Sequence, residues 1–431
     1  MVIDSSNKSI CMLLALVCFL TSGMPVIAQN TISWQGPQGS ELPENWETRL
    51  RYKHIISAPM NRLSNVQSRQ YTQREDSRKV AFQIKKRGES VYLLFAGADE
   101  YGEFPLLGRG NVSIKRDVAS GDYLYMTVLI RDRPECYIRM YPGDGRTFLD
   151  VVLFGVEIHH RLILPKKFSS ILFSPIAQII RMTRDRVHWD LILNRGNSDK
   201  ALKMIEQIRS QLPRLTDLDD GAYSKTGKPV YISTEKPSAG GMNCSGFAKW
   251  IVDGFYFPLT GQYTDIRRLR EKLFEFRGNR WSERYEAERD PYFGLDWSRN
   301  LAAELNDARG ISRTTHPEEF DVRKVDYLSY REDIGYPVSS LQLLLFILAH
   351  REPGSFYLGS LNQEYGSDPT LHQHVHLAVL VPYFLPDGRF EVAVFEINRE
   401  TSIASLMQRY ESDYIHLVGI ADRGRFQPVT Y

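Results

Sequence analysis

The sequence predicts an α+β protein in which a β-rich domain precedes a second domain of helices and strands. Residues 46–195 contain short apolar runs separated by turn residues, which is typical of antiparallel strands. Residues 200–215 instead place apolar side chains at helical spacing, and a further helix is expected from Cys244 onward. Strand-like runs return near the end of the chain, where residues 387–388 form a hairpin signal.

The composition is that of an ordinary globular protein. Of the 431 residues, 42% are hydrophobic and 25% are charged, and this length predicts two or three domains. The formal net charge is only +2. Proteins that bind nucleic acid usually carry a basic face or stripe, so we expect no nucleic-acid partner.

The first residues predict an export signal. Lys8 precedes an apolar run at 10–20, and Val26 and Ala28 fit cleavage after Ala28. The run is about half of the ~20 residues that a bilayer span requires. We therefore expect a signal peptide at 1–28 and a mature protein in the periplasm or outside the cell. No stable membrane insertion is expected after cleavage.

The first half of the mature chain is expected to be an accessory domain. Residues 29–45 are polar with Gly and Pro, which predicts a linker. The β-rich domain then covers 46–195, with strands over 91–95, 123–130 and 148–154. Its sequence contains no group of residues that indicates acid–base or metal chemistry.

The second domain is expected at 196–431 and begins with the helix at 200–215. Ser198 or Asp199 can cap the start of this helix, and Pro213 limits its far end.

A charged segment at about 261–335 follows within the second domain. Residues of both signs are interspersed there, for example at 267–272 and 280–285. This pattern predicts a solvated helical insertion with internal ion pairs.

Cys244 lies where a catalytic thiol is expected. A loop at 237–241 leads to Asn243, a good helix cap, and Phe247 and Trp250 then begin a helical apolar face. Cys244 is therefore expected in the first turn of a helix. The positive end of a helix dipole and a nearby imidazole both favour the thiolate, which is the nucleophilic form.

The imidazole is expected from the segment at 371–381. His376 begins an apolar strand of Leu, Ala and Val, which favours it as the base, and His374 is the alternative. His372, His374 and His376 alternate in sequence, so all three are expected to project from one face of a continuous strand.

Several segments, in chain order, resemble those of NlpC/P60 cysteine peptidases, a family of papain-like cell-wall hydrolases. The most specific is Asn-Cys-Ser-Gly-Phe at 243–247, which is similar to the family's Asp-Cys-Ser-Gly-Phe signature. The others are the tyrosine segment, the Pro-Gly-Asp turn, the histidine strand and the hairpin after it, here at 228–232, 352–357, 376–379 and 387–390. The resemblance spans roughly 220–420. It departs from the pattern where Asn243 replaces Asp and Ser355 replaces Asp.

The resemblance implies a papain-like catalytic domain in which a cysteine-bearing helix packs on an antiparallel sheet. It implies a cysteine endopeptidase or amidase that cleaves amide bonds of peptidoglycan stem peptides and needs neither cofactor nor metal. Cys244 would be the nucleophile and His376 the base.

A polar residue on the next strand would orient the histidine ring. Counting from the hairpin favours Glu396, with Asn398 as the alternative. Tyr231, Asn243 and Ser245 are the expected residues of the substrate and oxyanion site, together with the backbone N–H of Cys244.

Two other readings compete with the thiol hydrolase. His372, His374 and His376 with Glu396 could hold zinc in a metal-dependent hydrolase, because His-x-His is common ligand spacing. Cys244 would then be a buried small residue or a disulfide partner of Cys136.

The second competitor is a non-catalytic protein that binds the wall or a glycan on a degenerate hydrolase scaffold. It follows from the departures at Asn243 and Ser355.

Overall fold

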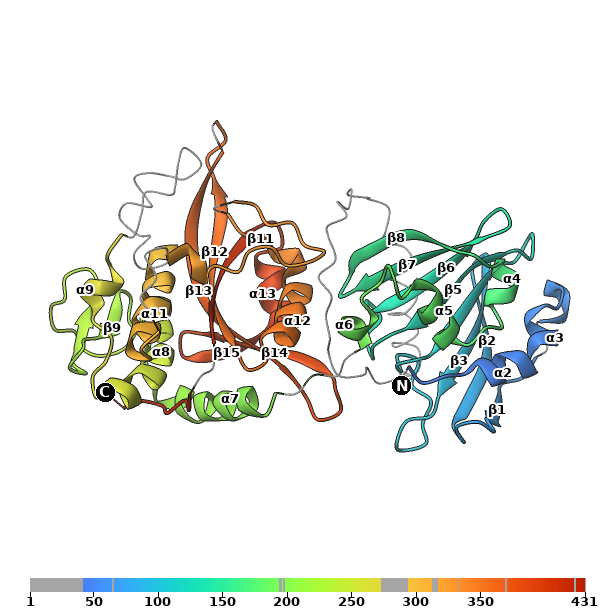
Figure 1. The fold of residues 1–431 in the computed structure, drawn as a ribbon, viewed down its shortest axis with the longest axis horizontal. Coiled ribbons are helices and arrows are strands. Elements are labelled where there is room, and N and C mark those ends of the chain that lie inside the picture. Colours follow the sequence, from blue (N-terminus) through green and yellow to red (C-terminus); the bar gives the residue numbers. More distant parts are fainter. Residues whose placement is uncertain are drawn as a thin grey trace, which may run out of the picture. The chain divides into compact units, whose positions relative to one another are not determined.

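The computed structural model describes residues 42–63, 66–193, 196, 198–272, 294–311, 317–332, 334–368, 370–421 and 424–430. The chain divides into two compact units, Met1–Arg195 and Gly196–Tyr431 (Figure 1). Both units contain helices and antiparallel sheets, so the protein is α+β. The predicted signal peptide and most of the predicted linker lie outside the described residues. Within the described ranges, every helix is too short or too polar to cross a bilayer.

Unit 1 is built on an eight-stranded antiparallel sheet whose strands follow one another in chain order. The strands are β1 (Arg69–Thr72), β2 (Lys79–Arg87), β3 (Ser90–Gly97), β4 (Val112–Asp117), β5 (Tyr123–Leu129), β6 (Tyr137–Pro142), β7 (Thr147–Leu153) and β8 (Val156–Leu164). The runs that predicted strands coincide with β3, β5 and β7.

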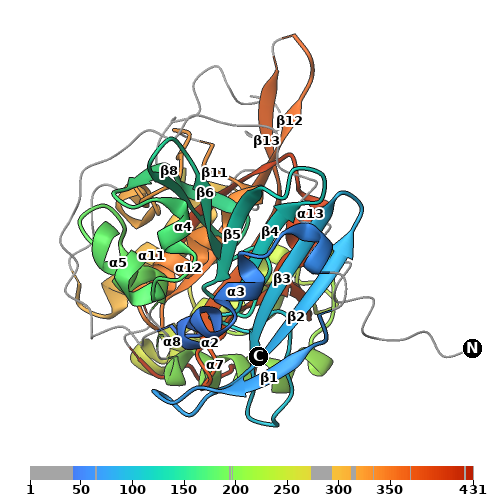
Figure 2. The same ribbon diagram turned by 90° about the vertical axis from the view of Figure 1, so that its right-hand side faces the viewer.

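Short helices cover one face of this sheet (Figure 2). They are α2 (Trp46–Arg51), α3 (Lys53–Ile56), α4 (Phe168–Ile171), α5 (Ile176–Thr183) and α6 (Trp189–Leu193). Tyr52, between α2 and α3, stacks on Phe82 of β2, with ring centroids 4.7 Å apart. The ring centroids of Phe82 and Phe95 of β3 are 5.0 Å apart. Because side chains alternate between the faces of a strand, this face holds the main core of the unit. The sequence analysis did not predict these helices.

Unit 2 contains a six-stranded antiparallel sheet in the order β11-β16-β12-β13-β14-β15. Its strands are β11 (Tyr336–Pro337), β12 (Phe356–Tyr365), β13 (Leu371–Phe384), β14 (Phe390–Glu396), β15 (Arg399–Ser402) and β16 (Tyr414–Ile420). A separate hairpin joins β9 (Gly221–Tyr223) to β10 (Pro229–Tyr231).

Helices pack on both faces of this sheet (Figure 1). One face carries α7 (Asp199–Gln211), α8 (Cys244–Thr260) and α11 (Leu295–Ala308). The other face carries α12 (Leu341–Arg351) and α13 (Ile403–Arg409). The ring centroid of Phe346 in α12 lies 6.0 Å from that of Phe384 and 5.3 Å from that of Phe390. The helix predicted at 200–215 is α7, and the helix predicted after the glycine-rich loop is α8.

The described part of the charged segment contains the helix and the internal ion pairs that we predicted, but it is buried and not solvated. After the short helix α9 (Ile266–Leu269), α11 is buried along most of its length. Its charges are paired: Arg299 donates to Asp321 at 2.9 Å, and Arg268 of α9 donates to Glu304 at 3.2 Å. Composition shows the charges but not their partners, and paired charges can be buried. The expected segment at 280–285 lies outside the described residues.

Candidate active site

The first turn of α8 presents Cys244. Asn243 has extended backbone geometry, and its Oδ1 accepts a hydrogen bond from the Gly246 N–H at 2.8 Å, so it caps the helix. The loop before it turns through Gly241, whose φ of +114° favours glycine. A Cβ on Gly246 would lie 2.3 Å from the carbonyl oxygen of Gly221. These local features hold the start of the helix against the β9 loop.

Cys244 is a free thiol in a nearly enclosed position. Its exposed fraction is 5%, and Cys136 is also free, so the alternative of a Cys136–Cys244 disulfide is wrong for this structure. Cys136 is fully buried in unit 1, and this burial raises the pKa of its thiol to about 12. The backbone N–H of Cys244 has no hydrogen-bond acceptor among the described residues. It therefore remains available to an oxygen that approaches the sulfur.

A β-bulge in β13 separates His376 from His374. In the pairing with β12, His374 lies opposite Asn362, whereas His376 lies opposite Leu361, so β13 carries one extra residue. Cross-strand partners point to the same face, and two consecutive strand residues point to opposite faces. His374 and His376 therefore point to opposite faces of the sheet. The prediction that His372 and both of these residues share one face is wrong, because simple alternation does not hold across a bulge.

His376 connects the thiol to a carboxylate. Its Nε2 lies 2.9 Å from Oε1 of Glu396, at the end of β14, and the Cys244 thiol is near enough to the ring to raise its pKa. Because Nε2 is engaged by Glu396, Nδ1 is the ring nitrogen that remains for the thiol. The ring stacks on Tyr410, with centroids 6.4 Å apart and planes at 10°. Side chains from α8, β13 and β14 thus gather at one site, where the ring interacts with both the thiol and the carboxylate.

Electrostatics favour a charged imidazole. Burial would lower the pKa of His376, but its hydrogen bonds with Cys244 and Glu396, and the charges of these groups, raise the pKa to about 9. Burial would likewise raise the pKa of Glu396, but hydrogen bonds from His376, Thr401 and Arg409 lower it to about 2. At neutral pH the site therefore favours an imidazolium next to a carboxylate.

Arg409 and Thr401 hold Glu396 from the side away from the ring. Arg409 Nη2 donates to Oε1 and Oε2 of Glu396 at 2.7 and 2.5 Å, and the Thr401 hydroxyl donates to Oε2. The Glu396 side chain is 1% exposed, so these donors supply the partners that a buried carboxylate requires. The sequence analysis missed Arg409, Thr401 and Tyr410. The available signal was local: Ser402 caps a short helix that ends at Arg409.

Three other residues that were predicted to belong to the site, Asn398, Asn243 and Ser245, have side chains in other roles or environments. Asn398 donates to the carbonyl of Leu215 at 3.4 Å and does not contact the His376 ring, so Glu396 occupies the third position. The Asn243 side chain is used by the helix cap. Ser245 is fully buried, and its hydroxyl has no hydrogen-bond partner within the described chain, so it does not line an open site.

Tyr231 ends β10 opposite Gly221, and its side chain is half-buried. No hydrogen bond among the described residues connects its hydroxyl to Cys244 or His376. Its expected contact with the substrate remains a prediction.

His374, the alternative base, belongs to a different buried network together with His372. By register, both lie on the face that carries His416. There His416 Nε2 lies 3.1 Å from Oδ2 of Asp321, which also accepts from Arg299. Burial lowers the pKa of His416, so this histidine favours the neutral form.

The four residues considered as zinc ligands do not lie on one face of the sheet. A tetrahedral zinc site needs ligand atoms that converge on one point, but the bulge separates His372 and His374 from His376 and Glu396. In the part of the chain that the structure describes, three potential ligands gather only in unit 1, at Asp150, Glu157 and His160.

Comparison with known families bears on unit 1 alone. Residues 38–191 match a domain of unknown function, DUF8515. No curated protein and no solved structure matches the chain. The match ends before α8, so it covers none of the residues around Cys244.

Proposed function

We propose that this protein is a cysteine hydrolase that cleaves amide bonds. The observation that carries the proposal is the grouping of Cys244, His376 and Glu396, in which the ring is hydrogen-bonded to the carboxylate and interacts with the thiol. Its three members come from separate elements of the fold, and Arg409 and Thr401 satisfy the far side of the carboxylate. A thiol, an imidazole and an orienting acid in this order are the groups that nucleophilic acyl transfer requires.

In the proposed resting state Nδ1 of His376 already holds the proton of the Cys244 thiol, so the reaction begins from a thiolate and an imidazolium. The sulfur then bonds to the amide carbonyl carbon, and the carbonyl oxygen becomes an oxyanion that the backbone N–H of Cys244 can stabilise. When the C–N bond breaks, His376 returns its proton to the leaving amine. Water then attacks the thioester, releasing the acid and regenerating the thiol. Glu396 holds the ring and stabilises the imidazolium throughout.

The substrate class rests on the resemblance to NlpC/P60 peptidases. We infer a papain-like catalytic unit, export from the cytoplasm, and peptidoglycan stem peptides as substrates. What supports this is the motif at 243–247 together with an antiparallel sheet that carries the histidine and the acid on successive strands, β13 and β14.

Chemical reactivity tests the nucleophile without knowledge of the substrate. Iodoacetamide should modify Cys244 in the folded protein and leave Cys136 unmodified, as mass spectrometry of the digested protein would show. Cys136 is a control within the same chain because it is fully buried with a raised pKa. Equal modification of both thiols, or of neither, would contradict an activated Cys244.

Activity tests the proposed substrate. Muropeptides incubated with the protein should release fragments, and Cys244→Ala should abolish the release while Cys136→Ala preserves it. A chelator should leave the release unchanged. Binding to cell walls by the wild type without any cleavage would instead support the non-catalytic reading.

A further inference from the structure

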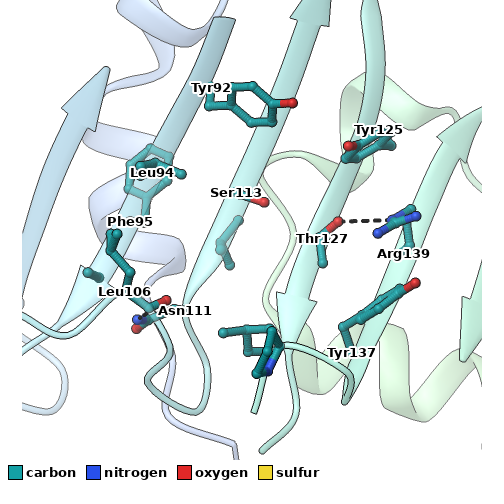
Figure 3. A pocket seen from close by; sticks show the side chains of 14 residues that line it. Tyr92, Leu94, Phe95, Leu106, Asn111, Ser113, Tyr125, Thr127, Tyr137 and Arg139 are labelled. Carbon is teal, nitrogen blue, oxygen red and sulfur yellow. Dashed lines mark hydrogen bonds between the residues drawn. The ribbon is translucent and has the colours of Figure 1, made fainter. Parts of the chain in front are cut away.

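The face of the unit 1 sheet that the helices leave uncovered carries a concave site (Figure 3). Cross-strand register brings its side chains together in rows. Leu94, Ser113, Thr127 and Arg139 are successive partners across β3 to β6, and Tyr137 pairs with a residue of β5 one row away. Partners on adjacent strands share a face, so this grouping follows from the ladder itself.

A structured loop closes one side of the site. Asn111 Nδ2 donates to the carbonyls of Pro105 and Leu106 at 2.6 and 3.2 Å, and its Oδ1 accepts from the Gly97 N–H at 2.9 Å. Leu106 thereby packs against Leu94 and forms an apolar wall. The concavity has an empty volume of roughly 630 Å³, which includes space that is open to solvent.

Arg139 supplies the charge of the site. Its guanidinium lies over the rings of Tyr125 and Tyr137, 4.7 and 4.4 Å from their centroids, and Nε donates to Thr127 at 3.3 Å. Among the described residues it forms no ion pair. Its cross-strand partner Asp150 instead accepts the Arg161 N–H at 2.7 Å.

The Tyr125 hydroxyl adds a second polar group to the site. It is buried and has no hydrogen-bond partner among the described residues. A buried polar atom without a partner is costly, so a ligand that bonds with it would gain affinity.

We propose that this concavity binds the C-terminal carboxylate of a short peptide with small apolar side chains. A guanidinium that lies over two rings and forms no ion pair within the described chain still presents N–H groups that match a carboxylate. Leu94 and Leu106 form the apolar wall for the side chains, and Thr127 and Tyr125 offer hydroxyls for peptide groups. A long acyl chain would need a deeper apolar channel than this shallow face. The inference concerns unit 1 alone and does not depend on the chemistry of Cys244.

Calorimetric titration of the full chain carrying Cys244→Ala tests the site without hydrolysis. The probes are N-acetyl-alanyl-alanine, its C-terminal amide and octanoate. The free acid should bind at least about tenfold more tightly than the amide, because a charge-assisted pair is lost in the amide. Arg139→Met should remove this preference. Arg146→Met, an exposed arginine at a turn of the same sheet, should leave it intact.

Tyr125→Phe gives a second variant that keeps the ring and the packing. It should weaken the binding of the acid several-fold, because only a hydroxyl contact is lost. Equal affinity for acid and amide, binding unaffected by Arg139→Met, or no binding of either peptide would overturn the proposal. Tighter binding of octanoate than of the dipeptide would also overturn it and would favour an acyl ligand.

Discussion

Glu396→Gln isolates the role of the carboxylate in the proposed active site. Gln has nearly the same shape, so the packing of β14 is retained while the negative charge next to His376 is removed. The wild-type ring has a pKa raised to about 9, and the Glu396 hydrogen bond and charge are among the causes, second to the hydrogen bond with Cys244. An opposite charge in contact shifts a pKa by roughly 1 to 3, so the substitution should lower the pKa of His376 by about 1 to 2. This change corresponds to about 1.4–3 kcal/mol of lost imidazolium stabilisation.

Two measurements check this reasoning. Histidine NMR titration, with the His376 signal assigned from a His376→Gln spectrum, should show the lower pKa directly. Muropeptide cleavage should lose about 10²–10⁴-fold in kcat/KM, the range for positioned acid–base groups. The matched control is Glu400→Gln, which removes a carboxylate from a partly exposed pair with Arg209 and should change neither value.

The same variant changes the pH dependence of stability. Glu396 has a pKa of about 2 when folded against an ordinary value of 4.5, so it contributes about 3 kcal/mol that is present above pH 4.5 and is lost as the pH falls through 2. The His376 contribution has the opposite sign: it is complete below pH 6.5 and is lost as the pH rises through about 9. Urea unfolding should therefore show the wild type losing its advantage over Glu396→Gln in acid. An unchanged His376 pKa together with unchanged acid stability would refute the role given to Glu396.

Two further predictions concern α8, which carries the thiol. Gly246→Ala should destabilise the protein by about 1–3 kcal/mol, because the new Cβ would lie 2.3 Å from a carbonyl oxygen; Gly419→Ala, whose nearest contact is an ordinary 3.5 Å, should cost far less in the same urea assay. Lys249→Met should cost about 3–5 kcal/mol, because it leaves the fully buried Asp253 carboxylate without its partner at 2.5 Å. Lys225→Met, at an exposed ion pair, should cost at most about 1 kcal/mol in thermal unfolding. Similar losses of unfolding free energy in Lys249→Met and Lys225→Met would contradict the expectation that burial makes the loss of an ion-pair partner more costly.

Local features of the proposed site could be predicted from residues that are close together in the chain. Asn243 is a strong cap, and an apolar face follows it, so a helix beginning at Cys244 could be predicted from residues within one turn of each other. The start of an apolar strand likewise indicated His376, whereas Glu396 was implied by the resemblance to NlpC/P60 peptidases. These signals depend on propensities and spacing along a short stretch of chain, which do not change with the rest of the fold.

Which side chains meet at the site depends on contacts between distant segments of the chain. The bulge in β13 turns His376 away from His374, and Arg409 reaches Glu396 from a helix that no motif had marked. The solvation predicted for the charged segment is wrong for the same reason, since Arg299 is buried in an ion pair with an acid 22 residues away along the chain. Strand register and burial arise from contacts between distant segments, and residue types along one stretch do not specify them.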